Sequence, residues 1–323
     1  MMDKASSIKK VFISTHPFGE ISSKPLDLLE AQGISYGLNP YGRKITTSEL
    51  ATQIKDCDAL IAGTEIIDSS VFENAPNLKL ISRVGIGLDG IDFDLAKMHD
   101  VKIAFTPDAP TLAVAELCIG LMFDCLRMIT ATDRHLREGK WHRHMGGLLY
   151  GKTVGIIGMG RIGKTLAHLL QPFNVKIMAN DIEPDMAFGH MMGIEWVDKR
   201  TLLENSDVIS LNVPLTKSTY HLVDDKAIEK MKPTAILINT ARGPIVDESA
   251  LVDALQQGMI AGAAVDVFEN EPYDGPLNQC ETVVLTCHMG ASTKESRQRM
   301  ELEATDEIIR YNSNEKLKNE VLF

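Results

Sequence analysis

Short apolar segments alternate with amphipathic segments along the first third of the chain. Four apolar segments, rich in β-branched residues, are typical of buried strands: residues 11–14, 34–38, 59–62 and 78–84. Between them, residues 24–32, closed by Gly33, and residues 48–55 have helical patterns. Strands that alternate with helices in this way predict a parallel sheet covered on both faces.

The pattern changes at residues 111–137, which are apolar on one face and contain no proline. This stretch predicts one long helix, because no proline interrupts its periodicity. We expect the helix to link two domains or to lie at a subunit contact. The alternative is an ordinary helix of a domain core.

The alternation of strands and helices returns after residue 152. Six further segments have the pattern of buried parallel strands: residues 153–157, 175–180, 207–211, 235–239, 261–265 and 283–285. Asp247 and Gly258 stand where an N-cap and the residue after a helix are expected. The chain therefore predicts a second parallel sheet.

A last helical pattern follows residues 292–295, whose sequence Ser-Thr-Lys-Glu has the form of a capping box. One face of this helix carries Met300, Ala304 and Ile308. The second sheet already has its strands, so we expect this helix to pack on the N-terminal domain.

The length and charge narrow the class of protein. A chain of 323 residues suits two domains of about 150 residues each. Its 33 basic and 44 acidic side chains give a formal charge of −11, which disfavours nucleic acid and anionic membranes as partners. The apolar residues 115–123 are too few to span a bilayer, and the N-terminus lacks the pattern of a signal peptide. We therefore expect a cytoplasmic protein without a membrane or nucleic-acid partner.

The cysteines and histidines do not predict a metal site. The five cysteines are widely spaced and form no CxxC, which favours reduced thiols. His135, His142 and His144 lie in a polar, basic stretch without a cysteine or carboxylate at ligand spacing, so we expect them to be solvated.

A glycine-rich turn gives the sharpest local signal. A predicted strand is followed by Gly158, Gly160 and Gly163, which open a predicted helix. Asp181, at the end of the next strand, lies 18 residues after Gly163. This context is typical of dinucleotide binding, with the pyrophosphate at the helix N-terminus and the carboxylate on the ribose hydroxyls. Asp181 would repel a 2′-phosphate, so we expect NAD and not NADP. The alternative is a glycine-rich turn in an unrelated α/β protein.

Arg242 directly follows another predicted strand, within Asn-Thr-Ala-Arg-Gly. Ligands of open parallel sheets bind outside the carboxyl ends of the strands. An arginine there can hold a carboxylate through two parallel hydrogen bonds and polarise a carbonyl. The alternative is a solvated surface arginine.

His288 and Glu271 also follow predicted strands, at the same edge of the sheet. Oxidation of an alcohol by hydride transfer needs a base for the hydroxyl proton, and histidine serves both directions of the reaction. A carboxylate beside the ring favours the imidazolium and fixes its orientation, and Glu271 is the candidate. A structural histidine is the alternative for His288.

Taken in order, the motifs resemble those of the D-isomer-specific 2-hydroxyacid dehydrogenase family. They are SRVGIGLD (82–89), VAEL (114–117), GIIGMGRIG (155–163), NVPLT (212–216), NTARG (239–243), DVFENEP (266–272) and CHMGAST (287–293). The resemblance implies two Rossmann-like or flavodoxin-like parallel-sheet domains. The NAD-binding domain, residues 106–290, would be inserted into a split substrate domain of residues 1–105 plus 291–323. It also implies a homodimer, with residues 111–137 at the contact.

The resemblance further implies residue roles. Arg242, Glu271 and His288 would be catalytic: Arg242 binds the substrate, His288 exchanges the proton and Glu271 tunes His288. The NAD contacts would be Gly158, Gly160, Arg161, Ile162, Gly163, Asp181, Val213, Pro214, Thr219, Thr240, Asp266 and Gly290. Val84 and Gly85 would offer backbone N–H groups to the substrate.

Within the family, Arg83 resembles an arginine of phosphoglycerate dehydrogenases that reaches the substrate phosphate; a solvated Arg83 is the alternative. The expected substrate is a small 2-hydroxy or 2-oxo acid, with 3-phosphoglycerate and 3-phosphohydroxypyruvate as one candidate pair. A glyoxylate or hydroxypyruvate reductase is the alternative. Glu271 disfavours a formate dehydrogenase, which would have glutamine there. A nucleotide-sensing corepressor without turnover is a further alternative.

Overall fold

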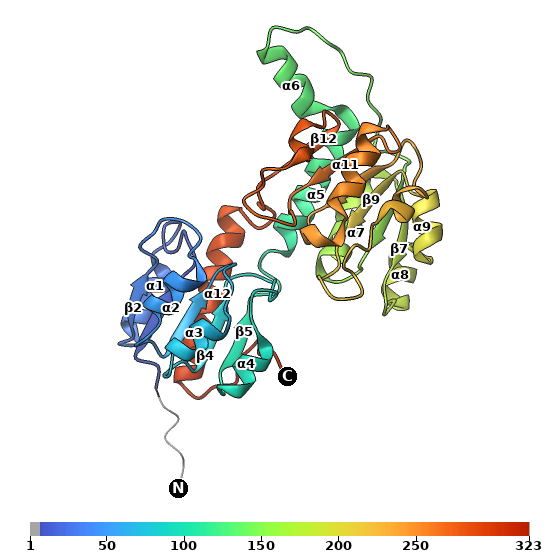
Figure 1. The fold of residues 1–323 in the computed structure, drawn as a ribbon. Helices are drawn as coiled ribbons and strands as arrows, with labels where there is room; N and C mark the ends of the chain where they lie inside the picture. The colour runs from blue at the N-terminus through green and yellow to red at the C-terminus, as the bar shows by residue number, and fades with distance from the viewer. Residues whose placement is uncertain (1–6, 323) are drawn as a thin grey trace. The chain divides into compact units, whose positions relative to one another are not determined.

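The computed structural model describes residues 7–322, which form two compact units. Unit 1 contains the described residues up to Pro110 and from Ala291 onward, and unit 2 contains Thr111–Gly290 (Figure 1). The sequence placed the start of the inserted domain at residue 106, and that division stays a proposal. Within residues 7–322, no helix combines the length and apolar composition needed to cross a membrane.

Unit 1 is a five-stranded parallel sheet with strand order β2-β1-β3-β4-β5. Its strands are β1 (Lys10–Ile13), β2 (Ser35–Leu38), β3 (Ala59–Ala62), β4 (Leu80–Arg83) and β5 (Lys102–Phe105). Its helices are α1 (Lys24–Ala31), α2 (Thr47–Gln53), α3 (Ser69–Asn74), α4 (Phe93–Met98) and α12 (Lys294–Asn312). The four predicted strands and two predicted N-terminal helices are present with slightly different ends, and β5 was not predicted.

The C-terminal helix α12 packs on the sheet of unit 1, as expected from its apolar face. Met300, Ala304 and Ile308 are buried in one cluster with Val11 and Ile61 of the sheet. In Figure 1 the red helix α12 accordingly lies beside the blue strand β4, which it contacts.

The capping box predicted at residues 292–295 is wrong by one residue. The N-cap is Thr293, whose hydroxyl accepts the N–H of Ser296 at 3.1 Å. Position N3 is thus a serine, whose hydroxyl donates to the Ala109 carbonyl at 3.1 Å. The Thr293 N–H donates to the Ala291 carbonyl at 3.0 Å and not to the N3 side chain, so the box is not formed. A capping box does occur in unit 1, between Thr46 and Glu49 before α2.

Unit 2 is a seven-stranded parallel sheet with strand order β12-β11-β10-β9-β6-β7-β8. Its strands are β6 (Thr153–Ile157), β7 (Lys176–Asn180), β8 (Glu195–Trp196), β9 (Val208–Leu211), β10 (Ile236–Asn239), β11 (Gly262–Val265) and β12 (Val283–Leu285). Its helices are α5 (Thr111–Arg127), α6 (Ile129–Arg137), α7 (Arg161–Leu170), α8 (Met186–Met192), α9 (Lys199–Asn205), α10 (Asp225–Ile228) and α11 (Glu248–Gln256), with 3₁₀ turns η1 (Gln171–Phe173), η2 (Gly243–Ile245) and η3 (Pro276–Gln279).

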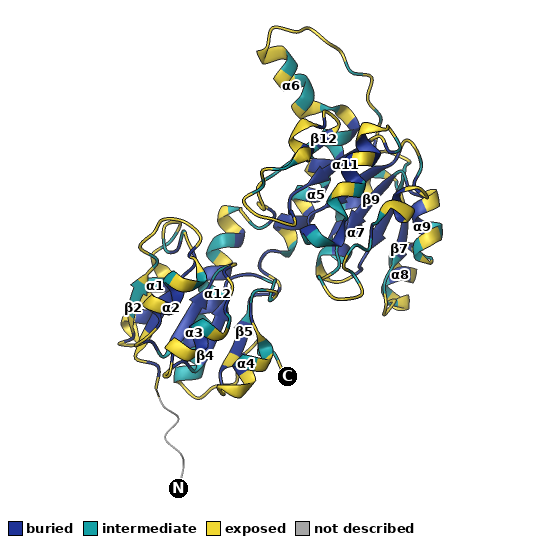
Figure 2. Ribbon diagram, in the orientation of Figure 1, coloured by how far each residue is buried: buried dark blue, intermediate teal, exposed yellow. Residues whose placement is uncertain are grey.

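Helices cover both faces of this sheet, so its central strands lie in the core of unit 2. Residues of α5 and α7 such as Cys118 and Leu166 pack on one face, and residues of α9 and α11 such as Leu202 and Leu251 pack on the other. The central strands of both units, such as β3, β4, β9 and β10, are accordingly dark blue in Figure 2. The predicted fold class, two doubly covered parallel sheets, is confirmed.

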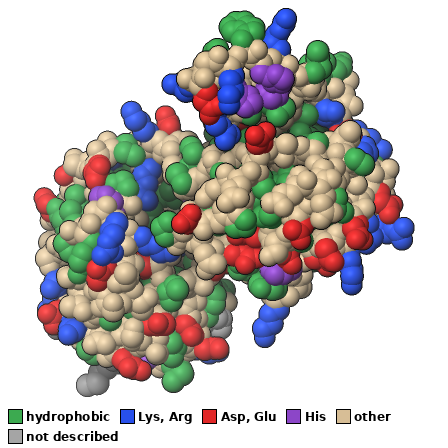
Figure 3. All heavy atoms as spheres, turned by 45° about the horizontal axis from the view of Figure 1, so that its top comes forward, with side chains coloured by type: hydrophobic (Ala, Val, Ile, Leu, Met, Phe, Trp, Pro, Cys, Tyr) green, Lys and Arg blue, Asp and Glu red, His purple; other side chains and the backbone are tan. Residues whose placement is uncertain are grey.

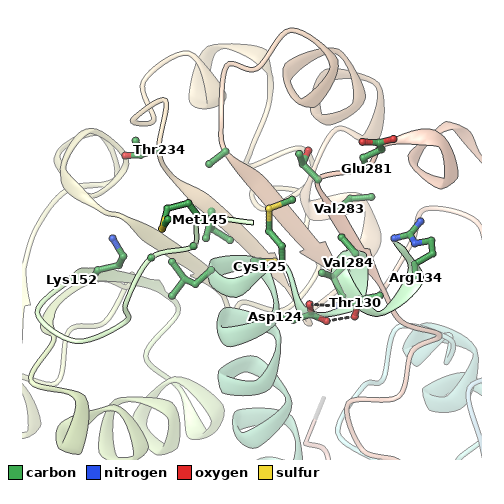
Figure 4. Close-up of a pocket in the computed structure, with 18 residues that line it drawn as sticks. Asp124, Cys125, Thr130, Arg134, Met145, Lys152, Thr234, Glu281, Val283 and Val284 are labelled. Carbon is green, nitrogen blue, oxygen red and sulfur yellow. Dashed lines mark hydrogen bonds between the residues drawn. The ribbon is translucent and has the colours of Figure 1, made fainter. Parts of the chain in front are cut away.

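The single long helix predicted for residues 111–137 is wrong, because it breaks at Met128. This residue has φ 52° and ψ 45°, a left-handed conformation that ends α5 before α6 begins. The carboxylate of Asp124 accepts the Thr130 N–H at 2.8 Å and also the Thr130 hydroxyl, drawn as dashed lines in Figure 4. These bonds satisfy the start of α6, none of whose residues is buried.

Candidate active site

The carboxyl ends of the parallel strands of unit 2 share one edge, and the predicted site residues follow them there. The glycine-rich turn follows β6, and Asp181 follows β7. Thr240 and Arg242 follow β10, Asp266 follows β11, and His288 lies shortly after β12.

The glycine-rich turn has the geometry that its sequence requires. Gly158 has φ 92°, and a Cβ there would lie 2.6 Å from the Asn212 carbonyl oxygen. A Cβ at Gly163 would lie 2.2 Å from the Gly158 oxygen, so only glycine allows this approach of helix to strand. A Cβ at Gly160 would instead meet nothing within 4 Å, and no side chain caps α7. This open turn at the helix N-terminus fits a pyrophosphate.

Asp181 is bound to the same turn. One carboxylate oxygen accepts the Met159 N–H at 2.6 Å, and the other accepts the Glu183 N–H at 3.0 Å. A carboxylate has about four acceptor positions, so Asp181 keeps capacity for the hydroxyls of a ribose. It therefore shapes the turn in addition to the role predicted for it.

Asn239, which the sequence reasoning did not single out, shapes the turn that carries Arg242. Its amide oxygen accepts the Ala241 N–H at 3.1 Å, and its amide nitrogen donates to the Arg242 carbonyl at 2.9 Å. Beneath the turn, the Thr240 hydroxyl lies 3.1 Å from the buried Cys118 thiol. The two bonds from Asn239 hold the backbone that carries Arg242. The Arg242 side chain in turn donates from Nη1 to the Ala241 carbonyl at 2.6 Å.

His288 and Glu271 form the pair that the sequence predicted. His288 Nδ1 lies 2.8 Å from Glu271 Oε2 and 3.1 Å from Oε1. The Phe268 N–H donates to Glu271 Oε1 at 3.1 Å and orients the carboxylate. With Nδ1 held by the carboxylate, Nε2 is the ring nitrogen that can exchange a proton with a bound molecule.

The buried carboxylate of Asp266 holds the loop on which His288 lies. It accepts the Thr286 hydroxyl at 2.6 Å and the N–H groups of Met289 and Gly290 at 2.8 and 3.0 Å. His288 itself has φ 52°, an uncommon backbone for a residue other than glycine. The three hydrogen bonds to Asp266 stabilise this conformation, and the contribution of Thr286 left no signal in the sequence.

The loops of Arg242 and Glu271 are in backbone contact. A Cβ at Gly243 would lie 1.9 Å from the Phe268 carbonyl carbon and 2.4 Å from the Glu269 nitrogen. The structure therefore brings the loops of all three predicted catalytic residues together in unit 2.

The residues predicted after β9 form a turn that bonds to itself. The Thr219 hydroxyl donates to the Pro214 carbonyl and accepts the Thr216 N–H, both at 2.7 Å. Val213 and Pro214 lie at the carboxyl end of β9, beside the glycine-rich turn. Thr219 is thus a residue of the turn, and its predicted contact with the cofactor stays a proposal.

The backbone N–H groups of the predicted substrate loop have acceptors within unit 1, and their predicted contact with the substrate stays a proposal. The Val84 N–H donates to the Ala62 carbonyl at 2.9 Å, and the Gly85 N–H donates to the Thr106 hydroxyl at 2.7 Å. The two amides are therefore already paired, and a substrate carboxylate would have to replace these acceptors. Arg83 is 9% exposed, and its guanidinium donates to the Val84 carbonyl. The alternative of a solvated Arg83 is wrong.

A hollow of about 380 Å³ lies away from these residues. Figure 4 shows it between α5, the segment after α6 and the amino ends of β10 and β12, with Cys125, Val283 and Val284 in its wall. Because these are the amino ends of the strands, the hollow is not part of the edge that carries His288.

The histidines of residues 135–144 contact one another. The rings of His142 and His144 are 4.4 Å apart between centroids, and those of His135 and His144 are 5.4 Å apart. Figure 3 shows a group of purple histidine side chains close to Lys and Arg side chains. Within the described residues, no group of His, Cys, Asp or Glu is arranged to hold a metal ion.

Comparison with known proteins gives consistent matches. Residues 119–290 match the model of the D-isomer specific 2-hydroxyacid dehydrogenase, NAD binding domain. A glyoxylate reductase of Thermofilum pendens is 46% identical over 262 residues, 78% of this chain and 77% of that protein. A D-3-phosphoglycerate dehydrogenase of Methanocaldococcus jannaschii is 39% identical over 289 residues, 88% of this chain but 54% of that protein. The crystal structure of the TT0316 protein from Thermus thermophilus superposes with a TM-score of 0.89 at 30% identity, covering 97% of this chain and 100% of that one.

Proposed function

The chain belongs to the D-isomer specific 2-hydroxyacid dehydrogenase family, and from this premise we propose that it reduces glyoxylate, or a 2-oxo acid of similar size, with NADH. It is an NAD-dependent D-2-hydroxyacid dehydrogenase, an enzyme and not only a sensor of the nucleotide. The substrate within that class, the residue roles and the assembly are the proposal.

The cofactor is held by residues of unit 2. The open turn at Gly160 and the N-terminus of α7 receive the pyrophosphate, and Asp181 accepts hydrogen bonds from the adenosine ribose. Thr240 and Asp266 lie further along the same edge, at the nicotinamide end of the cofactor. When bound, NADH supplies the hydride that reduces the carbonyl carbon of the substrate.

The chain's own residues handle the carboxylate and the proton. Arg242 binds the substrate carboxylate and polarises the neighbouring carbonyl. His288 donates its Nε2 proton to the carbonyl oxygen, which becomes the hydroxyl of the product. Glu271, 2.8 Å from Nδ1, orients the ring and stabilises its protonated form before the transfer. The Glu271–His288 pair at the cofactor edge is the observation that carries this mechanism.

The proposal that the substrate is a small, unphosphorylated acid rests on the burial of Arg83. Its guanidinium donates to the Val84 carbonyl, and a Cβ at Gly85 would lie 2.6 Å from Arg83 Nη1. A guanidinium that is only 9% exposed and packed on Gly85 favours support of its own loop over binding of a substrate phosphate. The identity of 46% with a glyoxylate reductase supports the same choice. Because the chain is also 39% identical to a phosphoglycerate dehydrogenase, 3-phosphohydroxypyruvate should be tested as a substrate too.

The test is NADH oxidation at 340 nm with glyoxylate, hydroxypyruvate, pyruvate and 3-phosphohydroxypyruvate. Wild type is compared with Arg83→Ala and with Arg200→Ala, an exposed control on α9. We expect the highest kcat/KM with glyoxylate or hydroxypyruvate, and a loss in Arg83→Ala that is similar for every acid. A preference for the phosphorylated acid that Arg83→Ala alone removes would overturn the substrate assignment.

A homodimer is the proposed assembly, and the exposed apolar residues around α6 support it. This helix buries none of its residues, Leu136 is 56% exposed and Trp141 is 84% exposed. Figure 2 shows α6 and the segment that follows largely in yellow. Light scattering should give the mass of two chains for wild type and for the control Leu38→Glu on β2, and of one chain for Leu136→Glu. A wild-type monomer would contradict the proposal.

A further inference from the structure

His221 lies between two carboxylates, in the segment that connects β9 to α10. Its Nε2 is 3.1 Å from Glu269 Oε1, and its Nδ1 is 3.6 Å from Asp247 Oδ2. The ring stacks on Tyr220 with centroids 4.0 Å apart, and His221 has φ 48°, in the left-handed region. The side chain is therefore fixed on three sides, and the proposed mechanism gives His221 no role of its own.

Each of these carboxylates belongs to a loop of the proposed mechanism. Asp247 is the N-cap of α11 and follows the turn η2, which begins directly after Arg242. Glu269 lies two positions before Glu271 in the loop that contacts His288. The ring of His221 thus spans from the Arg242 loop to the Glu271 loop.

The backbone of His221 is bound to the first of these loops. Its N–H donates to the Pro244 carbonyl at 2.8 Å, and Val223 N–H donates to the Ile245 carbonyl at 3.1 Å. His221 consequently moves with the Arg242 loop. Its Nε2 contact then connects that loop to Glu269.

A third carboxyl, that of Glu248, lies near Glu269. Burial raises the pKa of Glu248. The charged and titratable groups that face His221 are thus Asp247, Glu269 and, behind Glu269, Glu248, with Tyr220 stacked on the ring. Of the two nearer carboxylates, only Glu269 is within hydrogen-bonding distance of the ring, at Nε2, whereas Asp247 lies 3.6 Å from Nδ1.

We propose that His221 is a positioning residue that holds the Glu271 loop in register with the Arg242 loop. The proposal rests on the function proposed above, because it assigns no chemistry to His221 itself. Its effect is transmitted through Glu269 to the Glu271–His288 pair. Loss of the contact displaces the proton donor from the bound carboxylate, and a displacement of about 1 Å costs on the order of 100-fold in rate.

Two substitutions separate the Nε2 contact from the backbone conformation. His221→Gln keeps an amide donor at the ε position, whereas His221→Asn tolerates the left-handed backbone and withdraws the donor from Glu269. We expect His221→Asn to lower kcat with glyoxylate about 10- to 100-fold. Its Kd for NADH should not change, and His221→Gln should recover most of the rate. The control is His190→Ala, an exposed histidine on α8, which should match wild type.

A double-mutant cycle tests how the effect is transmitted. Glu269→Ala should reproduce His221→Asn, and the double variant should be no slower than either, because both remove the same contact. A variant that is only less stable would have a lower Tm and keep the wild-type kcat below that temperature.

Hydrogen exchange gives a reading that does not require turnover. In His221→Asn, the amides of residues 267–271 should exchange faster than in wild type, and those of residues 158–163 should not. If the wild type had no activity on any 2-oxo acid, the proposed function would be refuted. The hydrogen-exchange measurement would then still test whether His221 positions the Glu271 loop. Additive effects of His221→Asn and Glu269→Ala, or unchanged exchange in residues 267–271, would overturn the inference.

Discussion

Gly243→Ala should separate the two loops that carry Arg242 and Glu271. An added Cβ would lie 1.9 Å from the Phe268 carbonyl carbon, whereas ordinary contacts begin near 3.4 Å. The backbones must therefore part by the difference, 3.4 − 1.9 = 1.5 Å. A misplacement of about 1 Å costs on the order of 100-fold, so we expect kcat to fall at least about 100-fold. Overpacking should also cost about 1–3 kcal/mol of unfolding free energy.

The assay measures kcat with glyoxylate, Kd for NADH by fluorescence, and Tm. Gly258→Ala is the matched control. Gly258 has φ 66°, so alanine strains its backbone, yet the added Cβ would meet nothing within 4 Å. The control should lower Tm and leave kcat unchanged, because Gly258 follows α11 and not a site loop. A Gly243→Ala enzyme with wild-type kcat, or an equal loss of kcat in Gly258→Ala, would refute the reasoning.

Three further outcomes follow from the site. His288→Ala should lower turnover about 10²- to 10⁴-fold with NADH affinity kept; near-normal turnover would remove its role as proton donor. Asp181→Ala should raise the kcat/KM ratio of NADPH to NADH, and an unmoved ratio would contradict its place at the ribose. Burial raises the pKa of Cys118 to about 11 and of Cys125 to about 12, so both thiols stay protonated and unreactive at pH 8. Mass spectrometry after Ellman's reagent should find label on the exposed Cys287, and label on Cys118 would contradict the expected order.

The long-range architecture was predictable because its signals repeat along the chain. Buried strands such as β3 and β9 are uninterrupted apolar segments, and parallel strands place their carboxyl ends at one edge. That rule alone placed Arg242 near His288. Short helices such as α3, α9 and α10 lack room for a periodic pattern, although each begins at an aspartate N-cap.

The features that the sequence did not predict are of two kinds. Some are contacts between residues far apart in the sequence, and others depend on a single backbone angle. Met128 ends α5 through a left-handed conformation that its side chain does not encode. Arg83 ends its strand, where a solvated arginine was one alternative, but only the packed structure shows that its side chain is buried. His221 and Glu269 are 48 positions apart, and no local motif relates them.

The return of α12 to unit 1 has a consequence for synthesis on the ribosome. Unit 2 ends at Gly290, so its sheet is complete while the last residues of the chain are still being made. Unit 1 lacks part of its core until Met300, Ala304 and Ile308 have emerged. Domains ordinarily mature from the N-terminus onward. In this chain the core of unit 1 can be completed only after the residues of unit 2 have been translated.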